Sequence, residues 1–285
     1  MNRKMVSWTI ALMVGMHGLT HADAKKEEDI ERTLRFADPK ANNLLIVDNV
    51  WGDVVVTGTN GSEIKVKAKK VFRARSEAAL AEMEEVVYLD INEESDMIEL
   101  YVEGPFRDRD GRTRHQRSWW RDHHEARYDF EIQVPRGTFL EVSTVNDGEV
   151  IIQDVEGDYD VHNVNGGIAM EKIGGSGEVY TVNGDVTVDF VKNPMKHSRY
   201  GSLNGDVRLY FLPKLSADFY LKTFNGEIFS DYPVAYLPIQ AKTSSEKKGG
   251  RYIYKVNRQT AVRTGQGGPE IELDGFNGDM FILKK

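Results

Sequence analysis

The sequence predicts an all-β protein with a stacked β-solenoid (β-helix-like) repeat fold and one short helix in its N-terminal half. The main observation is a corner motif in the second half of the chain: a hydrophobic residue, Asn-Gly, a small or acidic residue, and an aliphatic residue. Its five copies are Val164–Ile168, Val182–Val186, Leu203–Val207, Phe224–Ile228 and Phe276–Met280, and a variant is Val145–Val150. Successive motif asparagines are 19, 18, 21, 21 and 52 residues apart. The first four spacings form a near-constant period of about 20 residues, which is typical of stacked repeats.

The Asn-Gly pair also has a second interpretation. It is the strongest short signal for a β-hairpin, because both residues tolerate a positive φ. A sandwich of independent hairpins is therefore the alternative fold. Aliphatic residues at matching offsets around each corner favour stacked strands that share one core. In either fold, we expect Asn and Gly at the corners because a tight turn needs positive φ.

The first 24 residues have the features of a secretory signal peptide. Arg3 and Lys4 precede an apolar run from Met5 to Met16, and Ala22–Ala24 forms an A-x-A end. The apolar run is too short to span a bilayer, and no later segment replaces it. We expect cleavage after Ala24, with an uncleaved anchor as the alternative. The sequence thus predicts a periplasmic or secreted protein, including one at the cell surface.

The amino-acid composition further narrows the possible classes of protein and of partner. The chain has no cysteine, so it can form no disulfide and carries no lipid-bearing Cys. The formal charge is -8, and since the first 24 residues carry two basic residues and one acidic residue, the remainder carries -9. Net acidity argues against a nucleic-acid partner.

Residues 25–42 are highly charged and predict an N-terminal lead-in. Residues 43–142 predict a degenerate half of β-repeats, in which Asp48–Val54 is a distant relative of the later corner. One helix is expected near residues 76–85, because Ser76 is a suitable N-cap and strong helix formers follow it. The strands expected in this half are 44–47, 53–57, 63–68, 86–91, 97–102, 128–134 and 139–142.

Residues 143–285 predict the regular half of the repeats. An insertion at 232–268 separates the last two corners and contains a probable strand, 252–256, between glycine-rich loops. The final strand, 281–283, is expected to close the stack, and Lys284 and Lys285 would protect its open edge.

These corners, the signal peptide and the closing segment Phe276–Ile282 resemble the bacterial "putative adhesin" family, a domain-of-unknown-function group with β-strand repeats that is related to heads of auto-transporter adhesins. The resemblance covers Val145 to the C-terminus well and Leu44 to Val142 more loosely. It implies an extracytoplasmic, right-handed β-helix-like fold. The chain departs from the simplest members in its helix at Ser76 and in an arginine-rich segment.

The acidic residues after the corners form a second candidate feature. If the repeats stack, Asp185, Asp206, Glu227 and Asp279 lie in a column at a strand spacing of about 4.8 Å. Such a column either points into water and binds nothing, or holds Ca²⁺ between turns. The sequence supplies no complete ligand set, so we assign no metal site and no cofactor.

The arginine-rich segment, Gly104–Arg127, is the candidate ligand site. Guanidinium groups grip sulfate, phosphate or carboxylate, and aromatic rings stack on sugars, so an anionic polysaccharide is the predicted ligand. The residues assigned to it are Arg107, Arg109, Arg112, Arg114, Arg117, Trp119, Trp120 and Arg121. The alternative is a mobile hairpin loop that joins Val102 to Tyr128. Neighbouring His123 and His124 would point in opposite directions on a strand, which argues against a metal site there.

No catalytic motif is present: the chain lacks a Gly-x-Ser-x-Gly elbow, an H-E-x-x-H pair, a phosphate loop and a nucleophilic Cys. We therefore expect a non-enzymatic β-repeat protein with a binding or structural role at the cell envelope. The alternatives are a β-helix carbohydrate-active enzyme, such as a polysaccharide lyase or glycosidase, and an envelope-signalling accessory protein.

Overall fold

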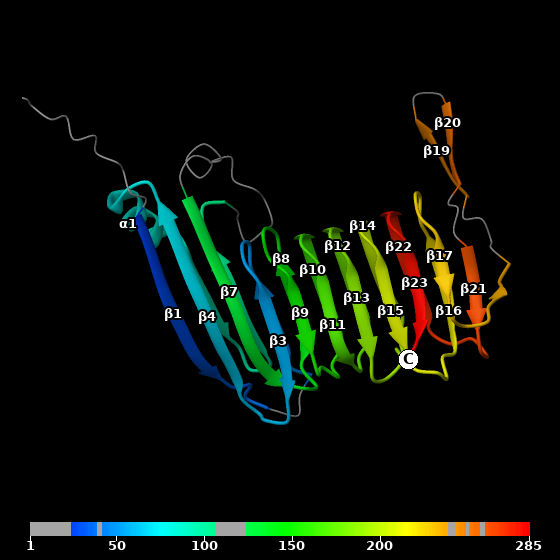
Figure 1. The fold of residues 1–285 in the computed structure, drawn as a ribbon, viewed down its shortest axis with the longest axis horizontal. Coiled ribbons are helices and arrows are strands. Elements are labelled where there is room, and N and C mark those ends of the chain that lie inside the picture. The colour runs from blue at the N-terminus through cyan, green and yellow to red at the C-terminus, as the bar shows by residue number, and fades with distance from the viewer. Residues whose placement is uncertain (1–23, 39–41, 107–123, 239–242, 249–250, 257–259) are drawn as a thin grey trace, which may run out of the picture.

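The computed structural model describes residues 24–38, 42–106, 124–238, 243–248, 251–256 and 260–285. Within these ranges the protein is all-β, with one helix, α1 (Glu77–Val86). Its strands form a ten-stranded sheet, an eleven-stranded sheet and a separate pair. In Figure 1 the strands of the two large sheets lie side by side along the longest axis of the molecule.

The order of strands in each sheet differs from their order in the sequence. The ten-stranded sheet runs β1 (Ala24–Leu34), β4 (Ile64–Ala74), β7 (His124–Pro135), β3 (Val54–Thr59), β9 (Val150–Gln153), β11 (Ile168–Ile173), β13 (Val186–Phe190), β15 (Val207–Phe211), β23 (Met280–Lys284) and β17 (Ile228–Ser230). The eleven-stranded sheet runs β18 (Ala235–Tyr236), β21 (Thr260–Thr264), β16 (Ala217–Lys222), β22 (Glu270–Asn277), β14 (Ser198–Asn204), β12 (Gly177–Asn183), β10 (Tyr159–Asn165), β8 (Phe139–Thr144), β2 (Leu44–Asp48), β6 (Met97–Glu103) and β5 (Tyr88–Glu93). The separate pair is β19 (Thr243–Lys248) and β20 (Arg251–Val256).

In the regular half, consecutive strands alternate between the two large sheets. Strands β12 and β13 flank one Asn-Gly corner and lie in different sheets, while β12 pairs in parallel with β10 and β14. The registers bring corner to corner, since Asn165 pairs with Asn183 and Asn183 with Asn204. The prediction that equivalent strands stack is confirmed, and the hairpin alternative is wrong, because the strands on either side of a corner do not pair with each other.

The shared core lies between the two sheets. Strand β13 has the buried pattern that repeats along the stack, with Val186, Val188 and Phe190 pointing inward. Equivalent side chains stack on one another, as Phe190 and Phe211 do with ring centroids 4.9 Å apart. Alternating apolar residues therefore build one continuous core rather than separate hairpin cores.

The N-terminal half continues the same arrangement. Its degenerate corner joins the stack as predicted, with Trp51 bridged to Asn146 and Val54 paired in parallel with Val150. The predicted helix is confirmed, and the Ser76 hydroxyl accepts a hydrogen bond from the Ala79 N–H. The region expected as a lead-in forms a strand, β1, which pairs antiparallel with β4 along its whole length. Its dense charge hid this strand from the sequence analysis.

The final strand does not close the stack, so that expectation is wrong. Strand β23 lies between β15 and β17, and β22 lies between β14 and β16. Its inward residues Met280 and Ile282 are as deeply buried as Val207 and Leu209 of β15. A repeated core offers nearly the same contacts at every level, so the order of copies along the chain does not fix their order in the stack.

Residues of the described ranges include no helix with the length and hydropathy needed to cross a bilayer.

Candidate interaction surface

The Asn-Gly corners line one long edge of the stack, here called the corner edge, which is the upper edge in Figure 1. Along it each asparagine donates from Nδ2 to Oδ1 of the asparagine in the neighbouring turn. The donors and acceptors are Asn165 to Asn146 (3.0 Å), Asn183 to Asn165 (2.8 Å), Asn204 to Asn183 (2.9 Å), Asn277 to Asn204 (2.8 Å) and Asn225 to Asn277 (2.9 Å). This asparagine ladder ends at Asn225, whose Oδ1 has no hydrogen-bond donor among the described residues.

The ladder corrects the expectation that the corner asparagines are needed for a positive φ. Of the corner glycines, Gly184, Gly205 and Gly278 have a positive φ, which is 139° at Gly278, and no corner asparagine of the described chain has one. A Cβ on Gly278 would also lie 2.1 Å from the Gly205 carbonyl oxygen. Glycine is therefore required for the turn and for close approach, whereas asparagine is required for the amide ladder.

The acidic residues after the corners accept main-chain hydrogen bonds. Oδ1 of Asp185 accepts from the N–H of Asp206, Oδ1 of Asp206 from that of Asp279, and Oδ1 of Asp279 from that of Glu227, each at 2.8 Å. The column expected from the sequence is thus present, and it crosslinks successive turns. Within the described ranges, no group of three or more His, Cys, Asp and Glu side chains is arranged to hold a metal ion.

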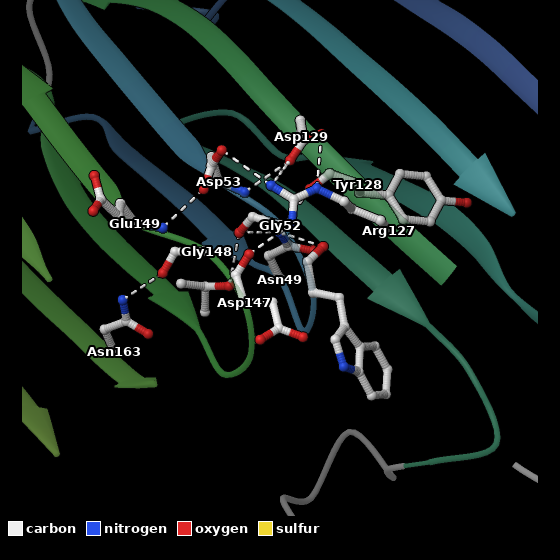
Figure 2. A network of polar contacts seen from close by, with 12 residues as sticks. Asn49, Gly52, Asp53, Arg127, Tyr128, Asp129, Asp147, Gly148, Glu149 and Asn163 are labelled. Atoms are coloured by element: carbon white, nitrogen blue, oxygen red, sulfur yellow. Dashed lines mark hydrogen bonds and ion pairs between the residues drawn. The ribbon is translucent and has the colours of Figure 1, made fainter. Parts of the chain in front are cut away.

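The same column recurs at the N-terminal end, where an arginine closes it. Figure 2 shows the guanidinium of Arg127 against Asp53 and Asp129, with the Tyr128 ring pointing away from them. Arg127 donates from Nε to Oδ2 of Asp129 (2.9 Å), from Nη2 to Oδ2 of Asp53 (3.0 Å) and from Nη1 to the carbonyl of Asp147 (2.6 Å). Its hydrogen bond with Asp129 raises the pKa of Arg127. The cation offsets repulsion between carboxylates that the stacking brings together.

A second arginine serves the C-terminal segment of the column. Arg208 donates to Oδ2 of Asp185 (2.9 Å) and to Asp206. Its guanidinium also lies 5.3 Å from the centre of the Phe281 ring, a cation–π contact. Among the described residues, Asp279 and Glu227 have no cationic partner, so the last two carboxylates of the column are not neutralised by an arginine or a lysine.

Inside the corner edge lies a row of buried polar side chains that the sequence analysis missed. Each stands two residues before a corner asparagine and donates to the carbonyl of a corner glycine in the preceding level. Examples are Thr181 Oγ1 to Gly166 O (2.8 Å) and Ser202 Oγ to Gly184 O (2.7 Å). The signal was available, because Thr144, Asn163, Thr181, Ser202 and Thr223 all precede a corner in this way.

The hydrophobic residue of each corner lies on the outer side of the edge, and it becomes larger and more exposed toward the end of the stack formed by β16 and β17. Phe276 is 43% exposed and Phe224 is 74% exposed, and their rings stack with centroids 4.8 Å apart and planes 4° apart. Phe229 and Phe281 form a second stack, with centroids 5.0 Å apart.

The last level of the stack therefore presents an exposed surface with two aromatic and two polar side chains. We call Phe224, Asn225, Glu227 and Phe229 the end face. Phe224 and Phe229 each have one ring face covered by the preceding phenylalanine, and they are the outermost members of their columns because β16 and β17 follow β22 and β23. Tyr236, 82% exposed, adds a further aromatic side chain in the segment that follows.

On the N-terminal strands, basic and acidic side chains lie next to one another at the surface. A shallow groove of about 340 Å³ lies on β1, β4 and β7. Basic residues of β4 line it between the acidic residues of its two neighbours, with Lys67 3.5 Å from Glu31 and Lys69 3.5 Å from Glu27. Charges of this kind protect a long edge strand such as β1 from unwanted pairing.

Two carboxyl groups of the eleven-stranded sheet have pKa values displaced in opposite directions. Two hydrogen bonds from Arg263, both 2.6 Å long, lower the pKa of Asp218. Partial burial raises the pKa of Glu141, and the neighbouring carboxylates of Asp160 and Asp48 raise it further.

The arginine and tryptophan residues assigned to a glycan site lie outside the described residues, so their prediction is untested. They are Arg107, Arg109, Arg112, Arg114, Arg117, Trp119, Trp120 and Arg121. The acidic column, by contrast, is found where the sequence placed it. The exposed end face was not predicted, although three of its four residues belong to the corner Phe224–Ile228 and the fourth, Phe229, follows that corner directly.

No model of a protein family matches the chain, and no curated protein matches its sequence. Several solved structures are similar in fold. One, described as a "putative cell adhesion protein" from Clostridium sporogenes, has a TM-score of 0.45 and 12% identity, and the match covers 91% of this chain and 100% of that one. A "putative adhesin" from Bacteroides fragilis has a TM-score of 0.37 and 12% identity, with 90% and 97% covered.

A third, described as a "putative lipid binding protein" from Parabacteroides distasonis, has a TM-score of 0.28 and 11% identity, with 90% and 96% covered. These descriptions belong to the matched proteins, and similarity at this level assigns no family to this chain. At this level of similarity no residue role is carried over to this chain.

Proposed function

We propose that this chain is a non-enzymatic binding protein of the cell envelope and that the end face is part of its binding surface. The observation that carries the proposal is the pair of exposed, stacked phenylalanine columns that end at Phe224 and Phe229. Exposed aromatic residues gathered at one place are typical of interaction sites, since isolated exposure is common and clustered exposure is not.

The arrangement of carboxylates supports a binding role over catalysis. The aspartates of the acidic column accept main-chain N–H groups, and most of them also pair with Arg127 or Arg208. A catalytic acid or base needs a free position beside a substrate and a pKa matched to its task. The signal-peptide pattern of residues 1–24 supports an extracytoplasmic location.

We also infer that the stack is a right-handed β-solenoid. Support comes from the alternation of consecutive strands between two parallel-paired sheets and from the corner-to-corner register. Connections between parallel strands of one sheet are right-handed in about 98% of known cases.

The anionic-polysaccharide ligand of the arginine-rich segment is a separate proposal, based on the sequence alone. Its test is deletion of residues 107–125 followed by chromatography on heparin and on cell-wall polysaccharide. Reduced retention supports the proposal, and unchanged retention removes it.

The main proposal is tested with the full chain and isolated cell envelopes. Labelled protein is incubated with envelopes, and the fraction retained after washing is measured for the wild type and for the double variant F224S/F229S. Met195→Ser is the matched control, because Met195 is 72% exposed and lies outside the end face.

Retention that is lost in the double variant and kept in the control supports the proposal. Equal retention of the wild type and the double variant contradicts it. Turnover of uronic-acid or sulfated polysaccharides, abolished by a single carboxylate substitution, would contradict the non-enzymatic part. Fractionation of cells that express the full chain tests the location.

A further inference from the structure

We propose that the end face docks an extended, arginine-bearing β-strand of a partner protein. The inference rests on the proposed function and specifies the partner of that same surface. Along the corner edge the inner levels repeat the same hydrogen bonds between asparagines and from main-chain N–H groups to aspartates, and the last level lacks the next partner.

The first requirement is a free strand edge. Among the described residues, strand β17 is the last strand of its sheet and has β23 as its one hydrogen-bonded neighbour. Main-chain groups of alternate residues therefore point away from the sheet. An open edge of this kind accepts an added strand from another chain through main-chain hydrogen bonds.

The second requirement is set by the carboxylate of Glu227. At the three preceding rungs, those of Asp185, Asp206 and Asp279, the carboxylate accepts the main-chain N–H of the next level, as Asp279 does from Glu227 at 2.8 Å. Glu227 has no such donor among the described residues. A strand added beside β17 brings an N–H group to this position, so the same hydrogen bond is repeated at one further level.

The third requirement is a cation, and the protein supplies two precedents for it. Arg127 closes the N-terminal segment of the column, and Arg208 serves the C-terminal segment while lying over the Phe281 ring. Phe281 lies between Arg208 and Phe229, because β23 lies between β15 and β17. The Phe229 ring face that points away from Phe281 is thus equivalent to the Phe281 ring face that Arg208 covers.

An arginine in the added strand, at the position paired with Phe229, meets both of these groups. Its guanidinium covers the free ring face, and the Glu227 carboxylate, two residues before Phe229, lies within its reach. Asp185, two residues before the Thr187 that pairs with Arg208, lies within reach of Arg208 in the same way. The charge complementarity is specific, because the end face carries a carboxylate with no described cationic partner. Arginine suits the site better than lysine, since its planar group stacks on a ring while it binds a carboxylate.

The fourth requirement concerns the ladder. Every other asparagine of the ladder accepts at Oδ1 from its neighbour, whereas Asn225 donates to Asn277 and its own Oδ1 has no donor among the described residues. An asparagine in the added strand, four residues before the arginine, continues the ladder. The chain itself contains this pattern in Leu203–Phe211, where Asn204 precedes Arg208.

The test uses that segment as the probe. A fluorescein-labelled peptide with the sequence of residues 203–211 is titrated against the full-length protein, and binding is followed by fluorescence anisotropy. A matched peptide carries Arg208→Met. The protein is tested as wild type, as E227Q and as the surface control Met195→Ser, and thermal unfolding checks that each variant is folded.

We expect the arginine peptide to bind the wild type and the control equally. Loss of the arginine weakens binding about fivefold, the size expected of an exposed cation–π contact and ion pair together, whereas loss of the Glu227 charge removes the ion pair alone and weakens binding by less. Combining the two changes adds little, because both remove the same interaction. Equal affinity of the two peptides, or no binding at about 1 mM, at the weak end of specific recognition, overturns the inference.

Failure of the inference can be told apart from failure of the proposed function. If F224S/F229S loses envelope retention while the arginine peptide does not compete and E227Q has no effect, the binding surface stands and the partner class is wrong. Sedimentation that shows a dimer dependent on Phe229 and unaffected by the arginine peptide also overturns the inference, since a second copy then covers the end face.

Discussion

The Nδ2 group of Asn277 donates a hydrogen bond to Oδ1 of Asn204, 2.8 Å away, although 73 residues separate them. Asn277 in turn accepts from Asn225, so the last corner of the chain is a middle rung of the ladder. The C-terminal strands thus lie inside the stack, and the fold is completed only when they are inserted between levels formed by earlier residues.

The ladder predicts a difference between interior and terminal rungs. Asn277→Ala removes two amide hydrogen bonds and should lower the free energy of unfolding by about 1–2 kcal/mol, whereas Asn225→Ala removes one and should cost about half of that. Urea unfolding followed by circular dichroism measures both. A loss for Asn225→Ala as large as that for Asn277→Ala would show that the ladder is not the source of the effect.

The buried row of hydroxyl groups predicts a larger effect from a change that keeps the volume. Thr181 is fully buried and donates to the Gly166 carbonyl at 2.8 Å. Thr181→Val leaves that carbonyl without its side-chain donor and should cost about 1–3 kcal/mol. Thr187→Val, on a partly exposed position of the next strand, is the control and should change stability by less than about 0.5 kcal/mol. Equal stability of the two variants would refute the capping role.

The contacts of Arg127 predict that the stability lost on its substitution depends on the salt concentration. Arg127→Met leaves Asp53 and Asp129 adjacent without a shared cation, so the variant should lose about 1–2 kcal/mol at low ionic strength. Salt screens the remaining repulsion, and the deficit should shrink as ionic strength rises. Arg136→Met is the comparison, because Arg136 contacts a single carboxylate, Asp154, at 3.0 Å. Thermal unfolding across a salt series tests this, and a deficit that salt leaves unchanged would contradict it.

The two displaced carboxyl groups predict opposite responses to pH. The pKa of Asp218 is lowered in the folded state, so its contribution is present above the unfolded pKa of about 3.9 and is lost as pH falls through the lower folded value. The pKa of Glu141 is raised, so ionisation costs stability above that folded value, and the cost disappears as pH falls below the unfolded pKa of about 4.3.

Two variants separate these effects in unfolding measurements between neutral pH and about pH 3. Asp218→Asn should be less stable than the wild type at neutral pH, with the gap closing in acid. Glu141→Gln should be more stable at neutral pH, with its advantage vanishing in acid. A gap that stays constant across the range in either variant would show that the shifted pKa of that residue does not contribute.

Much of the fold follows from local pattern. The corner motif and its spacing predicted parallel stacking, and the Ser76 cap and its helix are present as predicted. Strand β1 was missed because its residues Lys25–Arg32 lack the alternation that marks a half-buried strand, and pairing with β4 supplies what its own sequence does not.

The candidate surface was less predictable. The acidic column was expected from the repeat, but its main-chain acceptor role depends on the exact level-to-level offset, which only the folded registers show. The polar residue two positions before each corner was visible in the sequence and was overlooked, because a Thr in a strand usually needs no explanation.

By itself, the sequence determined the repeat: alternating aliphatic residues specify a shared core, and glycine specifies the tight corner. The tertiary structure alone decided the order of the levels, because the copies have nearly equivalent cores and local pattern cannot rank them. That order places Phe276 and Phe281 inside the stack and leaves Phe224, Glu227 and Phe229 at its end. The exposed aromatic face therefore exists because the final strands are inserted one level before the last.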